Sequence, residues 1–559
     1  MKLLSTMIGV MTMALVPSDS GRNAKENQLE TFLSAHVKRI KPLSKETRLA
    51  HWNASITGKP EDYDRLSKLE LEMCQIYSNR EEFVFLEGLR ESGQVKDAEL
   101  RRQVERLYNR YLENQIEPQL LKRMIALDTK IARTFNTFRG TIAGETVTLN
   151  QINKILTTEA DSRKREEAWR ASKQVGAAVA GDLLTLVRLR NQAARSIGFD
   201  NYHTLSLTTA EQSLEELDKI FAELCELTRE PFAELKAELD RSLSRMYGVS
   251  PDELMPWHYH DPFFQRTPLV QEVDLDAFYG RADVRKLAEK FYASVGLPVD
   301  DILGRSDLYE RPGKDQHAYS IDVDREGDVR ILCNLTNEER WMETVLHELG
   351  HAVYSKYHDP SQPYLLRAPA HAFTTEALAM FFGRLSRNAA WMEKMLGLSE
   401  EDRAKIEKVE REYTRFQQII FARWAMVMYD FEKRLYADPD QDLDSLWWEL
   451  VEKYQLLKKP PEAPRAAWAS KTHFTTAPCY YHNYMLGELL ASQLHNCIVH
   501  SVLQRPSDEG LSYVGETKAG DFLREKVFGP GAVYHWNEMI QRATGERLTP
   551  KYFVAQFVR

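Results

Sequence analysis

The sequence predicts a mostly α-helical protein. Apolar residues recur every three or four positions with charged residues between them, for example in 100–112 and 214–227. The interruptions are local and contain several prolines, as in 247–268 and 460–478. No internal repeat and no long low-complexity linker divides the chain, so we expect a single domain over 21–559.

The composition is that of an ordinary globular protein and excludes several classes of function. The chain has 74 Lys and Arg against 83 Asp and Glu, a net charge of −9. An acidic balance argues against sequence-independent binding of nucleic acid, which needs a basic face. The 5 cysteines form no CxxC pair, which excludes a zinc ribbon and a thioredoxin-type redox site.

The first residues have the features of a targeting segment. Lys2 precedes the apolar run 3–16, and small residues follow up to Ser20. This order is typical of a secretory signal peptide over 1–20, which predicts a secreted or periplasmic protein. A cytoplasmic protein with an apolar leader is the alternative. The run is too short to cross a bilayer, and no later stretch reaches about 18 apolar residues without a charge.

One segment departs from the helical pattern. Residues 316–322 and 328–335 flank the turn Asp324–Gly327, which predicts a β-hairpin. An edge strand of this kind can bind an extended peptide through main-chain hydrogen bonds. A purely structural flap is the alternative.

The segment that follows carries an HExxH motif, His347 to His351. At this spacing both imidazoles leave one face of a helix and can bind a single Zn²⁺. Glu348 is then placed to take a proton from a water molecule instead of binding the metal. Thr336 and Glu339 predict a capping box at the start of the helix. A helix with two surface histidines is the alternative, but an apolar stripe indicates that the helix is buried, formed by Met342, Val345, Leu346, Leu349 and Val353.

A third ligand must come from outside the motif, because a catalytic zinc needs three protein ligands and one open position. Glu376, 25 residues after His351, is the best candidate. We expect it in the first turn of a second buried helix. Two alternatives remain open: His371 is the ligand, or Glu376 only complements the helix N-terminus.

Together these motifs resemble those of the gluzincin peptidases, most closely the angiotensin-converting-enzyme (peptidyl-dipeptidase A) family. The thimet-oligopeptidase group is a more distant resemblance. The likeness covers 310–557 well and the N-terminal helices loosely. The blocks that carry it are His317-Ala318-Tyr319-Ser320, the HExxH motif with Glu376, Trp447 to Gln455, Lys471-Thr472-His473 and Pro478 to Tyr484.

The resemblance implies a fold and a cofactor. It implies a large helical shell with a deep central cleft between two lobes and a small β-hairpin beside the zinc helix. It also implies one Zn²⁺ per chain, held by His347, His351 and Glu376, with Glu348 as the general base. Tyr484 resembles the tyrosine that stabilises the oxyanion.

The same resemblance assigns the substrate contacts. His317 and Ala318 match the strand that holds the substrate main chain, and His473 matches a histidine that hydrogen-bonds to it. Lys471 and Tyr481 match the pair that binds the terminal carboxylate of the substrate.

Three departures from the family pattern are visible. Two arginines that bind chloride in the family correspond to Asn483 and Val451. A glutamine that helps to bind the substrate carboxylate has no clear equivalent near Trp257. The acidic residue four positions after the zinc glutamate is replaced by Met380.

These observations predict a monomeric zinc peptidase that acts on short peptides and releases C-terminal dipeptides. One alternative is an oligopeptidase that cuts internal bonds, or a carboxypeptidase that removes one residue. Another is a peptide-binding relative that has lost catalysis. The intact Glu348 argues against the last, because binding alone needs no general base.

Overall fold

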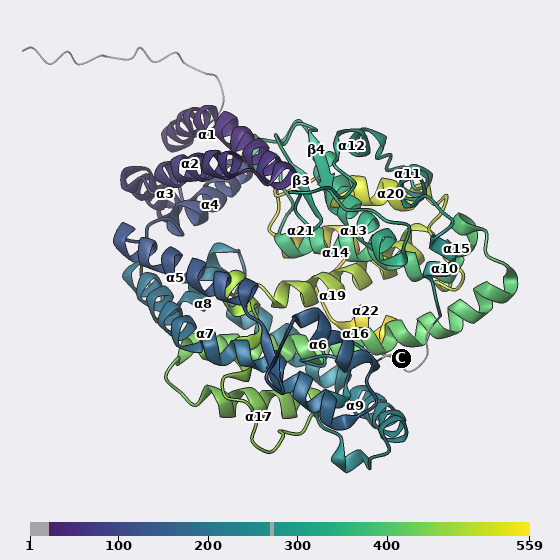
Figure 1. The fold of residues 1–559 in the computed structure, drawn as a ribbon. Coiled ribbons are helices and arrows are strands. Elements are labelled where there is room, and N and C mark those ends of the chain that lie inside the picture. Colours follow the sequence, from purple (N-terminus) through teal and green to yellow (C-terminus); the bar gives the residue numbers. More distant parts are fainter. Residues whose placement is uncertain (1–21, 269–272, 559) are drawn as a thin grey trace, which may run out of the picture.

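The computed structural model describes residues 22–268 and 273–558 and confirms a mostly helical protein (Figure 1). The predicted leader, 1–20, lies outside the described residues. Within the described part of the chain, no helix has the length and apolar character needed to cross a membrane.

Long helices dominate the N-terminal half. The first are α1 (Ala24–Thr57), α2 (Pro60–Tyr77), α3 (Arg80–Ser92), α4 (Ala98–Leu112), α5 (Pro118–Thr137), α6 (Leu149–Thr158) and α7 (Ser162–Ser196). They are followed by α8 (Tyr202–Thr209), α9 (Leu214–Tyr247), α10 (Asp276–Tyr279), α11 (Val284–Ser294) and α12 (Asp300–Arg305). Local signals set their ends: a capping box of Asn23 and Glu26 begins α1, and Gly58 ends it at φ 65°.

The C-terminal half contains the helices that carry the predicted site. They are α13 (Glu339–Lys356), α14 (Ala372–Gly383), α15 (Ala389–Leu396), α16 (Glu400–Ala437), α17 (Leu443–Gln455), α18 (His473–Thr476), α19 (His482–Cys497), α20 (Thr517–Leu523), α21 (Trp536–Thr544) and α22 (Lys551–Phe557).

The predicted hairpin is confirmed and is shorter than expected. Strands β3 (Tyr319–Asp322) and β4 (Val329–Leu332) pair antiparallel, with Tyr319 opposite Leu332. A second hairpin was not predicted: β1 (Gly140–Ile142) pairs with β2 (Glu145–Val147). Its two-residue turn is Ala143-Gly144, with φ of 50° and 87°, the left-handed backbone that tight hairpin turns require.

Two hydrophobic cores hold these elements together. The smaller core joins α1, α3 and α4, where Leu29, Leu86 and Tyr111 are fully buried. The larger core contains the buried faces of α13, α14, α16 and α19. Tyr364 and Leu365 belong to the smaller core although they lie between α13 and α14 in the sequence. The N-terminal helices are therefore anchored beside the segment that leads into α14.

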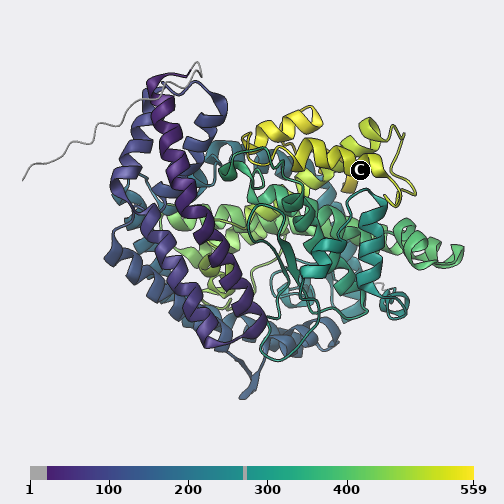
Figure 2. The ribbon, with the colours of Figure 1, turned by 90° about the horizontal axis from the view of Figure 1, so that it is seen from above.

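The arrangement places α19 in the middle of the molecule. In Figure 1, α13, α14 and the β3–β4 hairpin lie on one side of α19, and α7, α9 and α17 lie on the other. Helix α19 packs against both α14 and α16. Figure 2 shows α1 running along one side of the molecule, and α1 contacts strand β3.

Candidate metal centre and substrate-binding residues

The HExxH motif lies on α13, as predicted, but the predicted capping box does not form. Thr336 does not cap the helix, which begins at Glu339. Instead, the backbone N–H of Glu339 donates to the Asp276 carboxylate at 2.8 Å. The Glu339 carboxylate accepts hydrogen bonds from Ser386 and Arg387, each at 2.7 Å. Residues distant in sequence therefore fix the start of α13, and a local motif could not reveal them.

Two glycines allow the helices of the site to approach closely. A Cβ added to Gly350, inside the motif, would lie 2.8 Å from the Cα of Ala379 on α14. A Cβ added to Gly487 on α19 would lie 3.4 Å from the Cβ of Glu376. A larger residue at Gly350 would push α14 away from α13, whereas the contact with Glu376 at Gly487 is of ordinary van der Waals length. The predicted apolar stripe is confirmed, because each of its members is 0% exposed: Met342, Val345, Leu346, Leu349 and Val353.

The predicted ligands come together. One ligand atom each from His347, His351 and Glu376 lies within 4.8 Å of the others. Oε2 of Glu376 is 3.7 Å from Nε2 of His347 and 3.8 Å from Nε2 of His351. Among the described residues no further ligand joins this group. Two imidazoles and one carboxylate fit a zinc site that keeps one position open.

Burial sets the protonation of these ligands. It lowers the pKa of His347 to about 4 and that of His351 to about 3, with His347 adding to the second shift. Both imidazoles are therefore neutral near pH 7, which is the form that binds a metal. Burial raises the pKa of Glu376 to about 7, and a hydrogen bond from Tyr480 opposes this rise.

Neighbouring hydroxyls orient two of the ligands. Nδ1 of His351 lies 2.8 Å from Oγ1 of Thr375, which leaves Nε2 of this ring for the metal. Tyr480 bonds to the carboxylate of Glu376. Such partners fix the orientation of metal ligands. From the sequence, neither residue was assigned a role at the metal, although Thr375 directly precedes Glu376 and Tyr480 lies in the block Pro478 to Tyr484.

The alternative ligand is excluded by the geometry. His371 precedes α14 and caps it, with its Nδ1 accepting from the backbone N–H of Phe373 at 3.1 Å. It is not part of the ligand group. The expectation that Glu376 lies in the first turn is wrong, since α14 begins at Ala372 and its first turn has no acidic residue. The helix N-terminus therefore does not explain this carboxylate.

Glu348 is buried on α13, between the two histidines in sequence and outside the ligand group. Burial raises the pKa of Glu348 to about 8, the Glu376 carboxylate adds to the rise, and a backbone hydrogen bond from Ser320 opposes it. A bound cation would favour the ionised form. The hydrogen bond from Ser320 also links Glu348 to strand β3, so the hairpin and the metal helix form one unit.

The predicted oxyanion tyrosine belongs to a group of aromatic rings. Tyr484 is half-buried, and its ring centroid lies 5.4 Å from those of Tyr480 and Tyr481 and 6.4 Å from that of His473. Burial and the Glu376 carboxylate raise the pKa of Tyr484. Its hydroxyl therefore remains protonated and can donate a hydrogen bond at neutral pH. Nδ1 of His473 is buried and has no hydrogen-bond partner within the described part of the chain.

Lys471 is buried, not a solvated loop lysine. Its Nζ donates to Oε1 of Gln265 at 2.7 Å and lies 5.2–5.4 Å from the ring centroids of Phe263, Trp424 and Tyr481. Burial lowers the pKa of Lys471 to about 8. The Tyr481 hydroxyl accepts from Nε1 of Trp424 at 2.8 Å.

Gln265 places a glutamine beside this lysine, although the sequence shows no clear equivalent near Trp257. Sequence analysis looked for one near Trp257, whereas the glutamine lies eight residues later in a loop. We call Lys471, Gln265 and Tyr481 the lysine site. It combines one cation, one amide and one phenol, groups that can bind a carboxylate.

The two residues predicted to hold the substrate main chain, His317 and Ala318, lie outside strand β3. Strand β3 begins at Tyr319, after His317 and Ala318. The His317 side chain is 96% exposed, and Ala318 packs against the larger core. Any role of His317 and Ala318 in binding a peptide is through the main chain or after a rearrangement, and it stays a prediction.

The two positions that replace chloride-binding arginines have different surroundings. Asn483 is buried, and its Oδ1 accepts from Nε2 of Gln212 at 2.8 Å. Val451 lines a small cavity of about 20 Å³ together with Lys173. Nζ of Lys173 donates to the carbonyl oxygen of Pro262 at 2.6 Å and lies 3.4 Å from the centroid of the Phe263 ring.

Both halves of the chain match peptidase families. Residues 302–559 match the model of peptidase family M3, and residues 23–261 match the model described as angiotensin-converting enzyme. The angiotensin-converting-enzyme match thus lies where sequence analysis expected only a loose likeness. The half with the HExxH helix matches peptidase family M3. The predicted resemblance to zinc peptidases, and to the angiotensin-converting-enzyme family among them, is confirmed.

Two curated relatives are distantly similar. The chain is 23% identical to an inactive angiotensin-converting enzyme-related protein of Caenorhabditis elegans over 55% of this chain and 38% of that protein. It is 24% identical to an angiotensin-converting enzyme-related protein of Drosophila melanogaster over 54% of this chain and 50% of that protein. The matched part covers half or less of each relative.

Proposed function

We propose that this chain is a zinc metallopeptidase that hydrolyses short peptides. The observation that carries the proposal is the buried Glu348 beside the ligand group His347, His351 and Glu376. A protein that only bound peptides or stored a metal would need no general base at this position. An intact general base supports an active peptidase over a peptide-binding relative that has lost catalysis.

The residues of the chain supply the steps of hydrolysis. When bound, zinc would polarise the scissile carbonyl and make a water molecule more acidic. Glu348 accepts a proton from the attacking water and returns it to the leaving nitrogen. The Tyr484 hydroxyl donates a hydrogen bond to the oxygen that becomes negative during attack. The ring of His473 orients the substrate main chain, which supplies the partner that its buried Nδ1 lacks.

We infer further that the enzyme releases dipeptides from the C-terminus. The lysine site supports this, because Lys471 and Gln265 offer a cation and an amide to a free carboxylate. An oligopeptidase that cuts internal bonds has no need of such a site. A deep cleft, as the resemblance implies, would admit oligopeptides and exclude folded proteins. Action as a secreted or periplasmic monomer is part of the same proposal.

Mass spectrometry of the products from a defined peptide mixture tests the proposal. We expect successive loss of two residues from the C-terminus, no products with a chelator, and recovery when Zn²⁺ is restored. Amidated copies of the same peptides should be cut more slowly. Products from internal bonds, at equal rates for amidated and free-acid peptides, would favour the oligopeptidase instead. If no peptide yields products, the remaining interpretation is a peptide-binding relative that has lost catalysis.

A further inference from the structure

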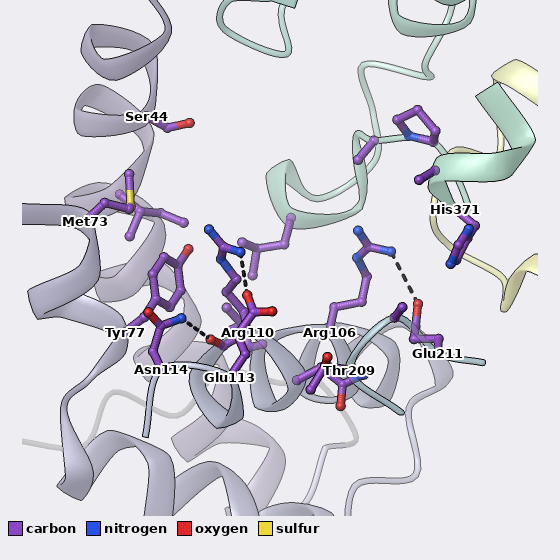
Figure 3. A pocket seen from close by; sticks show the side chains of 18 of the residues that line it. Ser44, Met73, Tyr77, Arg106, Arg110, Glu113, Asn114, Thr209, Glu211 and His371 are labelled. Atoms are coloured by element: carbon purple, nitrogen blue, oxygen red, sulfur yellow. Dashed lines mark hydrogen bonds and ion pairs between the residues drawn. The ribbon is translucent and has the colours of Figure 1, made fainter. Parts of the chain in front are cut away.

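A large cavity lies beside the metal centre, at the junction of the two hydrophobic cores. It has a volume of about 930 Å³ and is lined by residues of α1, α2, α4 and α8 and by the segment that leads into α14. Figure 3 shows Arg106 and Arg110 rising from α4 into this space, with His371 on the facing wall.

The cavity reaches the metal centre through two residues already described. Thr375 and Tyr480 line it, and these are the partners of the ligands His351 and Glu376. None of the residues of the lysine site lines it. The cavity and the lysine site are therefore separate sites, and the cavity adjoins the metal centre at Thr375 and Tyr480.

The cavity wall carries a small excess of positive charge. Four arginines line it, namely Arg48, Arg106, Arg110 and Arg325, with three glutamates, Glu70, Glu113 and Glu211. The exposed Arg110 pairs with Glu113 at the edge of α4.

Glu211 does not neutralise Arg106 fully, because it is shared. Arg102, outside the cavity, binds both oxygens of Glu211, and Nη2 of Arg102 lies 2.9 Å from Oε2. Nη1 of Arg106 lies 3.6 Å from the same oxygen. Glu211 is thus shared by two guanidinium groups, while Glu105 approaches only Arg102, at 3.8 Å.

Arg48 and Arg325 have no ion-pair partner within the described part of the chain. Arg325 lies in the turn of the β3–β4 hairpin, donates to the carbonyl oxygen of Tyr364 at 3.0 Å and packs over its ring. Arg48 on α1 donates to the main-chain carbonyl of Asp322. Arg48 and Arg325 each donate one hydrogen bond to a main-chain carbonyl. Their other N–H groups have no carboxylate within salt-bridge distance among the described residues. The Asp322 carboxylate itself accepts from the backbone N–H of Arg325.

The position of the cavity identifies its occupant, provided that the proposed function is right. A peptide held at its C-terminal carboxylate by the lysine site and cut at the metal centre must continue on the other side of the metal. We propose that this cavity, with Arg48, Arg106 and Arg325, binds the part of the substrate that precedes the cut bond and favours acidic side chains there. Guanidinium groups suit this role because their planar donors match a carboxylate.

The experiment compares peptide pairs that differ by one oxygen or nitrogen. Each pair carries Glu or Gln at successive positions before the cut bond and shares one C-terminal dipeptide. We expect kcat/KM for the Glu peptide to exceed that of its Gln partner by about tenfold at the best position. This ratio should fall as NaCl is raised, because salt screens charges in an open cavity.

Two arginines of the same region provide the variant and its control. Arg325→Gln should bring the Glu-to-Gln ratio close to one. Arg305→Gln should leave it unchanged, because Arg305 also donates to the hairpin turn, at Gly327, but does not line the cavity. Melting temperatures verify that both variants fold. A ratio near one in the unaltered enzyme overturns the inference, as does an equal loss of the ratio in both variants.

A binding measurement separates this inference from the proposed function. Fluorescence anisotropy of labelled Glu and Gln peptides with a non-hydrolysable bond reports affinity without turnover. Tighter binding of the Glu peptide, lost in Arg325→Gln, supports the inference even if no peptide is cut. Equal binding of both peptides to a chain that does hydrolyse peptides overturns the inference and leaves the proposed function intact.

Discussion

The lysine site and the arginine-lined cavity carry cations in opposite ways. Lys471 is enclosed by three aromatic rings and has one polar partner, Gln265. In the cavity, arginines are spread over the wall of a space of about 930 Å³. One enclosed charge suits a terminal carboxylate that must stop at a fixed point. A broad charged wall suits side chains whose positions vary from peptide to peptide.

If the lysine site and the cavity serve one reaction, loss of the general base of that reaction should have the largest effect. Glu348→Gln should lower kcat by about 10³–10⁴-fold for every peptide, because the attacking water would lose its proton acceptor. The metal should stay bound, since Glu348 is outside the ligand group. Kinetics and metal analysis of the same sample are the measurements.

The control for this variant is Glu338→Gln. Glu338 is exposed at the start of the same helix and makes no capping hydrogen bond, so its loss should leave kcat unchanged. Normal turnover by Glu348→Gln would contradict the proposed mechanism. The lysine site and the cavity could then no longer be interpreted as substrate sites of this reaction.

Two neighbouring tyrosines separate catalysis from metal binding. Tyr484→Phe should lower kcat by about 10²–10³-fold with little change in KM, because one hydrogen bond to the developing oxyanion is lost. Tyr480→Phe removes the partner of Glu376 and should instead weaken zinc binding by about 10–100-fold. Titration of activity with Zn²⁺ distinguishes them, since excess metal should restore Tyr480→Phe and not Tyr484→Phe. A change in KM alone would make Tyr484 a packing residue.

The lysine site makes a prediction that the arginine-lined cavity does not share. Lys471→Met should raise KM for free-acid peptides by about 10–100-fold, the range expected when a charged hydrogen bond is lost. Amidated peptides should change far less, because they lack the carboxylate. Equal effects on both substrates would show that Lys471 stabilises the fold and does not bind the terminus.

The pH dependence of KM gives an independent readout for the same residue. Burial lowers the pKa of Lys471 to about 8, so the ammonium loses its proton as the pH rises through that value. KM for free-acid peptides should therefore rise between about pH 7 and pH 9, while KM for amidated peptides stays level. The arginines of the cavity keep their charge over this range. A pH-independent KM for free-acid peptides would place the terminal carboxylate elsewhere.

The sequence was sufficient for the metal centre because its geometry is local. His347, Glu348 and His351 lie within one helical turn or so, and a buried helix with a carboxylate soon follows at Glu376. The role of Gly350 was not predicted, because its reason is the close approach of Ala379 on another helix.

Contacts between segments that are distant in the chain could not be predicted from the sequence. Gln265 meets Lys471 across 206 positions of the chain, and Arg48 meets the hairpin across 274. No spacing rule predicts such pairs, since tertiary packing brings them together. For the same reason the helix start at Asp276 and Glu339 was missed, while a local capping motif with Thr336 was expected in its place.

Chloride should affect activity least, and this tests whether inorganic anions bind at the positions that replace the two arginines. Neither replaced position can bind an anion by charge: Asn483 is occupied by its bond to Gln212, and Val451 is apolar. Lys173 shares a cavity with Val451, but its ammonium is bonded to a carbonyl oxygen, and burial lowers its pKa well below the usual value. Exchanging chloride for acetate at fixed ionic strength should therefore change kcat/KM by less than about twofold, because screening is equal in both salts. Steep activation by chloride that disappears in Lys173→Met would show that this buried lysine has replaced the missing arginines.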